Sequence, residues 1–166
     1  MSADYPLQEL VEIKERRFQE AARILEKKKK QLLEEEEKLK EKERERDKVL
    51  KHKLEKLHQL RQALDQGERT DKIQQMKRYK EVVDERLAEK EKQVDAQKKQ
   101  VKLAEEQVEA AKKDLYQKQK DVEKLTTHKK EWMSEMEREE TRKEAAEQDE
   151  IGAALHSRKN KKKKSS

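Results

Sequence analysis

One row of apolar residues in the second half of the chain repeats every seven positions and limits the possible folds more than any other feature. The row consists of Leu87, Val94, Val101, Val108, Leu115 and Val122. An apolar spacing of seven marks one stripe of an α-helix that winds around a second helix, because supercoiling draws the turn from about 3.6 to about 3.5 residues. The sequence therefore predicts a coiled coil.

A second row of the same spacing lies in the first half and consists of Val11, Phe18, Leu25, Leu32 and Leu39. A charged segment, residues 40–48, interrupts it. The apolar positions that follow are Val49, Leu50, Leu54, Leu57, Leu60 and Leu64. The step of 11 residues from Leu39 to Leu50 predicts a four-residue stutter, at which the supercoil relaxes locally.

The two rows are separated by a turn signal at residues 65–71, where Gly67 suits the left-handed position that ends a helix and Thr70 or Asp71 can cap the next one. Folding the chain back here pairs the rows in antiparallel register. Leu64 then faces Ile73, Leu60 faces Met76, Leu54 faces Val83, Leu50 faces Leu87, Leu32 faces Ala104 and Leu25 faces Ala111. The charged segment falls opposite residues 88–97. The predicted fold is all-α, with two long helices forming an antiparallel coiled-coil hairpin.

We expect a single domain, with a leader at 1–6 that ends at Pro6, a first helix at 7–66, a turn at 67–71, a second helix at 72–151 and a disordered basic tail at 152–166. Gly152 is the expected end of the second helix. The tail has too few apolar residues to fold by itself.

Composition supports this interpretation, since 51% of the residues are charged and only 30% are hydrophobic. The net charge of +6 resides in residues 157–166, and the rest of the chain is neutral. No cysteine is present, no apolar run reaches the length of a membrane span and the N-terminus has no export signal. We therefore expect a cytoplasmic protein.

No catalytic motif was found. The sequence has no glycine-rich phosphate loop and no nucleophile elbow, and its four histidines are not spaced as metal ligands on a helix. The paired glutamates would lie on a solvated helical face. We expect no enzymatic activity, no cofactor and no metal.

Two regions are candidates for binding partners. One is an apolar group at the expected open end of the hairpin, which is either the closing layer of the fold or an exposed anchor for a partner: Tyr5, Leu7, Trp132, Met133 and Met136. The other is the basic tail, which is either a solvated end or a docking element for an acidic protein, an anionic membrane or a nucleic acid: Arg158, Lys159, Lys161, Lys162, Lys163 and Lys164. The tail has no aromatic residues that would favour base stacking.

The stretch from Leu7 to Leu25, followed by Gln31 and by residues 34–39, resembles the N-terminal helix of the FliJ/YscO family of type III secretion stalk proteins. The similarity includes the element Glu20-Ala-Ala-Arg-Ile-Leu25. It implies a cytoplasmic two-helix rod in the pore of the hexameric secretion ATPase. In that family the rod links the ATPase to the export gate protein at the inner membrane, and members also handle export chaperones.

The middle of the first helix offers no aromatic or large apolar residue for an apolar contact with the gate protein. Its residues are charged: Lys38, Lys42, Glu45 and Arg46. We expect charge-matched contacts there. The leading hypothesis is a monomeric hairpin acting as the ATPase stalk. The alternatives are a generic coiled-coil scaffold that pairs as a homodimer, and a spacer whose basic tail is a tether to nucleic acid or to an anionic membrane.

Overall fold

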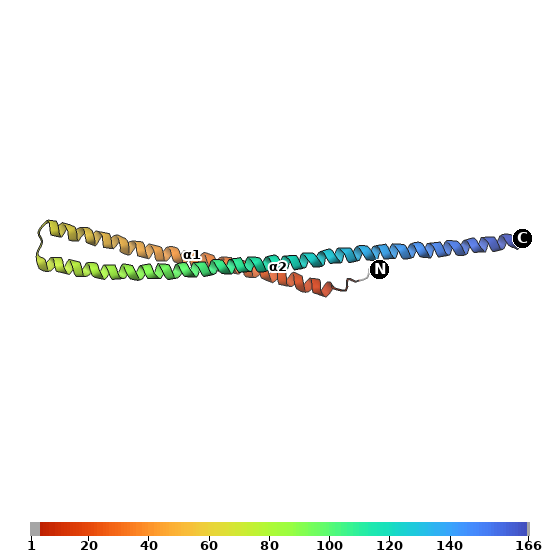
Figure 1. The fold of residues 1–166 in the computed structure, drawn as a ribbon, viewed down its shortest axis with the longest axis horizontal. Coiled ribbons are helices and arrows are strands. Elements are labelled where there is room, and N and C mark those ends of the chain that lie inside the picture. The colour runs from red at the N-terminus through yellow and green to blue at the C-terminus, as the bar shows by residue number, and fades with distance from the viewer. Residues whose placement is uncertain (1–3, 166) are drawn as a thin grey trace. The chain divides into compact units, whose positions relative to one another are not determined.

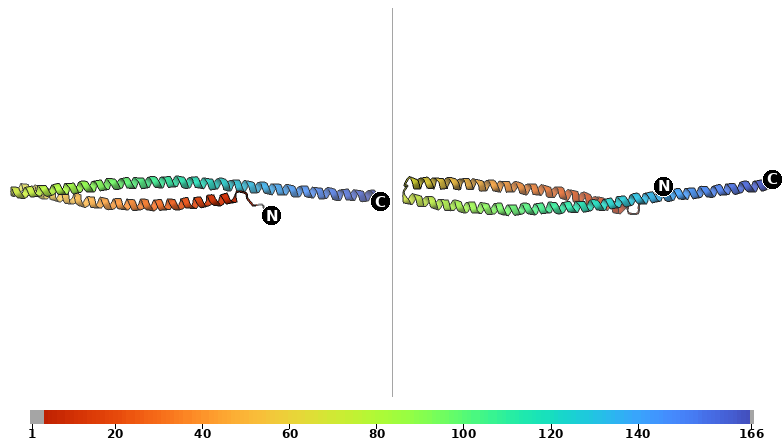
Figure 2. Two further views of the ribbon diagram at one scale, coloured as in Figure 1. Left: turned by 90° about the horizontal axis from the view of Figure 1, so that it is seen from below. Right: turned by 45° about the horizontal axis from the view of Figure 1, so that its top comes forward.

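The computed structural model describes residues 4–165 and contains two α-helices, α1 (Gln8–Asp65) and α2 (Thr70–Lys164), with no strand among these residues. The two helices are joined by a short turn and run back along each other (Figures 1 and 2). The predicted all-α hairpin is confirmed. The helix bounds lie within two residues of the predicted ones, except at the C-terminal end of α2.

The turn follows from a single glycine. Gly67 has a φ of 67°, a left-handed conformation that costs a residue with a Cβ atom free energy. The amide of Glu68 donates to the carbonyl of Ala63 at 3.0 Å, and the amide of Gly67 donates to that of Leu64 at 3.2 Å. These two hydrogen bonds form a Schellman motif, which satisfies the last carbonyls of α1 and confirms the predicted role of Gly67.

The start of α2 differs from the prediction by a few residues. The amide of Ile73 donates to the carbonyl of Arg69 at 3.0 Å, so Arg69 occupies the N-cap position instead of Thr70 or Asp71. Asp71 lies in the first turn, where a carboxylate interacts favourably with the helix dipole. Its Oδ1 atom also lies 3.5 Å from Nε of Arg69.

The heptad row of α2 is the centre of the packing. Its first four members, Leu87 to Val108, are all buried, as is the interleaved group Val83, Ala104 and Ala111. Val83 and Val94 are almost completely inaccessible, at 0% and 1% exposure. Burying one such side chain contributes about 1.5 kcal/mol or more. The predicted register is confirmed where Leu25 packs in one cluster with Val108 and Ala111, while Leu32 and Leu115 pack against that cluster.

The predicted stutter in α1 is wrong. The inward positions continue without interruption from Leu39 through the half-buried Arg46 and Lys53 to the buried Leu60, each step being seven residues. Because the facing row of α2 keeps an unbroken heptad, α1 must keep the same period to stay in contact with it. Three leucines that the sequence assigned to the interface are therefore displaced to the surface, with exposures of 39% for Leu50, 57% for Leu54 and 50% for Leu64.

By its contacts the chain divides into two compact units, and the single domain stays a prediction. The first comprises residues 1–20 together with 116–166, and the second comprises residues 21–115. In each unit a segment of α1 packs against a segment of α2. This division has a simple cause, since a residue in a two-helix pair contacts only its sequence neighbours and the residues directly across from it.

The expected end of the second helix at residue 151 is also wrong. The helix continues through Gly152 to Lys164, so the tail is helical up to that residue and Ser166 lies outside the described residues. One glycine in a helix costs only about 1 kcal/mol. The neighbouring Ala153, Ala154 and Leu155 are strong helix formers, and lysines in the last turn complement the negative end of the helix dipole.

Candidate partner-binding surfaces

An aromatic cluster lies in the first unit, where the segment before α1 packs against α2. Tyr5, 6% exposed, packs edge-on against Trp132 with ring centroids 5.4 Å apart, and its ring lies 5.8 Å from that of His128. The Tyr5 hydroxyl and Nδ1 of His128 form a hydrogen bond. Lys129 donates to Oε1 of Gln8 at 2.7 Å beside the cluster. The structure thus brings together Tyr5 and Trp132, as the closing-layer interpretation predicts.

The other predicted members of this group are more accessible. Met133 is 45% exposed and Leu7 is 39% exposed, while Met136 is half-buried. An edge-on aromatic pair contributes about 0.5–1.5 kcal/mol beyond its buried area, so Tyr5 and Trp132 stabilise the unit. Met133 and Leu7 are the members available to a partner.

The four charged residues predicted in the middle of α1 are largely occupied by ion pairs within the chain. Glu45 accepts a hydrogen bond from Nζ of Lys90 across the interface at 3.1 Å, and Lys42 lies 4.0 Å from the same Glu45 oxygen. Arg46 pairs with Asp47 at 3.1 Å. Lys38 approaches Glu35 at 3.5 Å, and its side chain is 63% exposed. Lys38 is therefore the most accessible charge of the four.

These polar layers change the titration of two carboxylates. The hydrogen bond from Lys90, and then its charge, hold the pKa of Glu45 below the ordinary value for a glutamate. The pKa of Glu35 is lowered mainly by a hydrogen bond from Gln97, with Lys38 adding to the effect. The Gln97 side chain also donates to the backbone carbonyl of Glu35 at 3.0 Å. Polar groups thus replace apolar packing in these layers and connect the two helices across the interface.

A surface that sequence reasoning missed lies on α1 near the turn. We call it the leucine stripe: Leu50, Leu54, Leu57 and Leu64. Their spacing of four, three and seven residues places them on one face of the helix. Leu50 borders a groove of about 360 Å³ whose floor includes the buried side chains of Leu87 and Val94 of α2.

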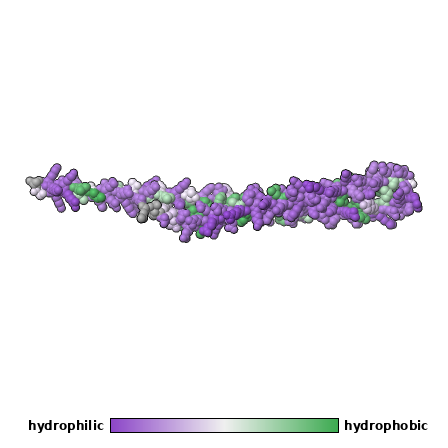
Figure 3. All heavy atoms as spheres, turned by 180° about the vertical axis from the view of Figure 1, so that it is seen from behind, coloured by the Kyte–Doolittle hydropathy of each residue, from purple (hydrophilic) through white to green (hydrophobic). Residues whose placement is uncertain are grey.

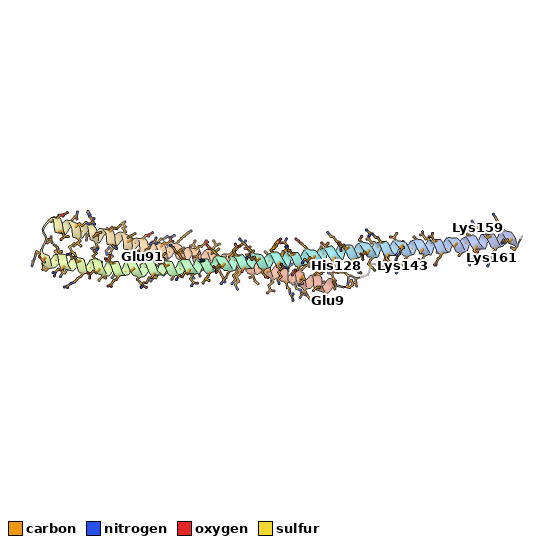
Figure 4. The ribbon with its side chains drawn as sticks, viewed as in Figure 1. Glu9, Glu91, His128, Lys143, Lys159 and Lys161 are labelled. Carbon is orange, nitrogen blue, oxygen red and sulfur yellow. The ribbon has the colours of Figure 1, made fainter. Side chains whose placement is uncertain are left out.

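The groove has an acidic border. Its lining includes Glu91 and Asp95 from α2, and Asp47 with its partner Arg46 from α1. Glu91 is labelled in Figure 4. Counting heptads onward from Leu39 through Arg46 and Lys53 would have revealed the leucine stripe in the sequence. The presence of cations at those inward positions obscured it.

The predicted basic tail forms the last turns of α2. All residues from Glu137 to Ser165 are exposed, including the six cations of the tail. Lys159 and Lys161 project from this end of the helix in Figure 4. The residues are brought together by the helix alone, since no other described segment covers them.

Residues 4–165 show neither a metal-binding group nor a membrane-spanning helix. No group of three or more histidine, aspartate or glutamate residues there is arranged to hold a metal ion. None of the helices in this described part of the chain has an apolar stretch long enough to cross a membrane.

The fold and these surfaces define a class of antiparallel two-helix coiled-coil proteins whose accessible features are charged faces and small apolar patches. The model of the YscO-like protein family matches residues 2–162. The chain belongs to the YscO-like family, and it is therefore a type III secretion-related protein. This family consists of structural components of the secretion system and is not known as a family of enzymes.

A solved structure agrees with this assignment. The chain is similar to CT670 from Chlamydia trachomatis, a candidate YscO homolog, with 43% sequence identity and a TM-score of 0.88. The similarity covers 93% of this chain and 95% of CT670. A comparison with curated proteins finds no match.

Proposed function

We propose that this protein acts as the central stalk of a type III secretion ATPase and links the ATPase hexamer to the export gate protein. Its membership of the YscO-like family over residues 2–162 is the observation that carries this proposal. The stalk would be a monomer, because each inward heptad row already has its partner in the same chain. Export chaperones are a further class of partner that the family resemblance implies.

The physical properties of the hairpin support a role inside a ring of identical subunits. Many of its ion pairs lie on the surface, as between Arg44 and Glu41 at 3.3 Å and between Lys112 and Glu109 at 3.4 Å. Such exposed pairs contribute only about 0–1 kcal/mol, so they can exchange for contacts with a partner at little cost. Distributed weak contacts allow a stalk to meet several equivalent subunits without binding one of them permanently.

The apolar surfaces give the proposal its specific contacts. We assign the leucine stripe and the accessible pair Met133 and Leu7 to partner binding, since exposed leucine and methionine side chains supply contact area that charged faces lack. The charged residues Lys38, Lys42, Glu45 and Arg46 would add charge-matched contacts.

Purified protein mixed with the secretion ATPase tests the proposal. We expect co-elution with the hexamer and a change in ATP turnover. Light scattering should give the mass of one chain for the free protein, whereas a dimer would favour the scaffold hypothesis. Absence of binding together with unchanged ATP turnover would contradict the stalk role.

Variants locate the contacts. Leu54→Lys combined with Leu64→Lys should weaken binding to the ATPase or to the gate protein by about tenfold, the loss expected when a charge enters an apolar contact. Leu33→Lys combined with Leu103→Lys is the matched control, because these leucines are also exposed, at 61% and 50%. Equal losses in both double variants would remove the leucine stripe from the proposal.

A further inference from the structure

The last turns of α2 form a concentrated positive charge on a regular helix. We call residues 151–164 the basic end segment. It carries six cations and no acidic residue, and every residue in it is exposed. An α-helix rises about 1.5 Å per residue, so its backbone keeps these charges close together along one axis. A flexible tail would let them move apart.

The same segment carries two exposed apolar side chains. Ile151 is 60% exposed and Leu155 is 54% exposed, one helical turn apart. Arg158 and Lys162 follow on the same face of the helix, seven and eleven residues after Ile151. Figure 3 shows a small hydrophobic patch on this otherwise hydrophilic end of α2. Apolar residues therefore lie directly beside the cations.

The preceding part of the helix has the opposite charge. Residues 135–150 contain eight acidic and three basic side chains, so a negative stretch adjoins the positive end. A partner with a uniform negative field would attract the last turns of α2 and repel the stretch before them. Such a partner would meet the helix at its end and leave the acidic stretch away from its surface.

From this arrangement we propose that the basic end segment binds the surface of an anionic lipid bilayer. Clusters of four to eight Lys or Arg residues on a helix are attracted to anionic headgroups, and adjacent apolar side chains can enter the boundary between headgroups and acyl chains. Long lysine side chains let the charges reach the headgroups while the helix axis stays above them.

Two features favour a bilayer over a nucleic acid. The basic end segment contains no Phe, Tyr or Trp residue, the side chains on which bases stack most extensively. Ile151 and Leu155 have no role in a purely ionic complex, whereas a lipid interface accepts them.

The test uses the full chain without any secretion ATPase, so that its result is independent of the stalk proposal. Vesicles of phosphatidylcholine alone are compared with vesicles that contain about 30% phosphatidylserine, and bound protein is measured by co-flotation. We expect binding to the anionic vesicles to be at least about tenfold stronger and to fall steeply as salt rises, because added ions screen the headgroup charge.

Two triple variants with the same change in net charge provide the control. Lys159→Gln, Lys161→Gln and Lys164→Gln should together weaken anionic vesicle binding by about tenfold. Lys98→Gln, Lys99→Gln and Lys102→Gln remove three exposed cations elsewhere on α2 and should change it less than about twofold. Equal losses in the two triple variants would mean that only the total charge matters and would overturn the proposal.

The apolar pair is tested separately. Ile151→Ser with Leu155→Ser should lower vesicle binding about threefold or more and leave its salt dependence unchanged, since apolar contacts are not screened. Circular dichroism confirms that helix content is retained. Equal binding to both kinds of vesicle would refute the proposal. Tighter binding to duplex DNA or RNA than to anionic vesicles would also refute the proposal, provided that the triple variant of Lys159, Lys161 and Lys164 abolishes the binding to nucleic acid.

Discussion

The paired segment of α2 around Val94 and the exposed segment from Glu137 to Lys164 are both regular helix, yet different forces stabilise them. Around Val94 the helix buries apolar side chains against α1. From Glu137 to Ser165 every side chain is exposed, and only local helix propensity and nearby charges support the helix. Helical structure alone is therefore no sign of a packed interface, and the two segments should respond differently to the same kind of change.

The largest expected difference comes from placing a charge in each segment. Val94→Asp should destabilise the second unit by roughly 3 kcal/mol, because the carboxylate would lie unpaired where exposure is now 1%. Thermal unfolding monitored by circular dichroism measures the effect. Ala146→Asp is the control in the exposed segment, and its unfolding midpoint should match that of the unmodified protein. A similar loss in both variants would mean that the exposed segment is packed in solution.

The two glycines give the next largest effect. Gly67→Ala should destabilise the hairpin by about 1 kcal/mol, since its φ of 67° is unfavourable for a residue with a Cβ atom. In a chain of this size that loss lowers the unfolding midpoint by about 2–4 °C.

Gly152→Ala should act in the opposite direction and only locally. Apart from the adjacent backbone of the helix itself, a Cβ atom at this position would have nothing within 4 Å, and alanine favours the helix by about 0.5–1 kcal/mol. Amide exchange in the basic end segment should slow, with no change in the unfolding midpoint. A higher midpoint would show that the end of α2 and the hairpin unfold together.

The smallest expected effect concerns pH. Glu45 has a pKa lowered chiefly by Lys90, so its ionised form stabilises the fold. This contribution is fully present above the ordinary pKa of a glutamate and disappears as pH falls through the lower pKa of the folded state. Unfolding midpoints measured from neutral to acid pH should therefore decrease slightly less in Glu45→Gln than in the unmodified chain. Glu137→Gln, in the exposed segment, is the control and should follow the unmodified curve. An unaltered acid response in Glu45→Gln would show that the contact with Lys90 is absent in solution.

Much of the fold could be predicted because the heptad spacing and the turn signal can both be recognised in short stretches of sequence. The row from Leu87 to Val108 identified the buried face of α2, and Gly67 marked the reversal of the chain. The pairing of Glu45 with Lys90 confirms that the charged segment of α1 faces residues 88–97. Among the candidate binding residues, the sequence left a closing layer and an exposed anchor as alternatives, and Tyr5 and Trp132 are in contact.

The errors arose where local preference and packing disagree. Leucines at 50, 54 and 64 are more hydrophobic than Arg46 and Lys53, so the sequence pattern assigned them to the interface. In the fold, the unbroken heptad of α2 determines which residues of α1 face the interface. The long side chains of Arg46 and Lys53 therefore lie half-buried there. At the end of α2, the sequence predicts a helix stop at Gly152, but the propensity cost of one glycine is too small to end the helix.

The sequence by itself determined that this chain forms an antiparallel two-helix hairpin, since the spacing of the residues encodes both apolar rows and the turn. Only the tertiary structure decided which side chains remain at the surface. Whether a leucine of α1 lies in the interface depends on which face of α1 is turned toward α2. All the packed layers together determine that orientation. The sequence of α1 allows either an unbroken heptad count or one that follows its leucines, and pairing with the unbroken row of α2 selects the first, which leaves the leucine stripe at the surface.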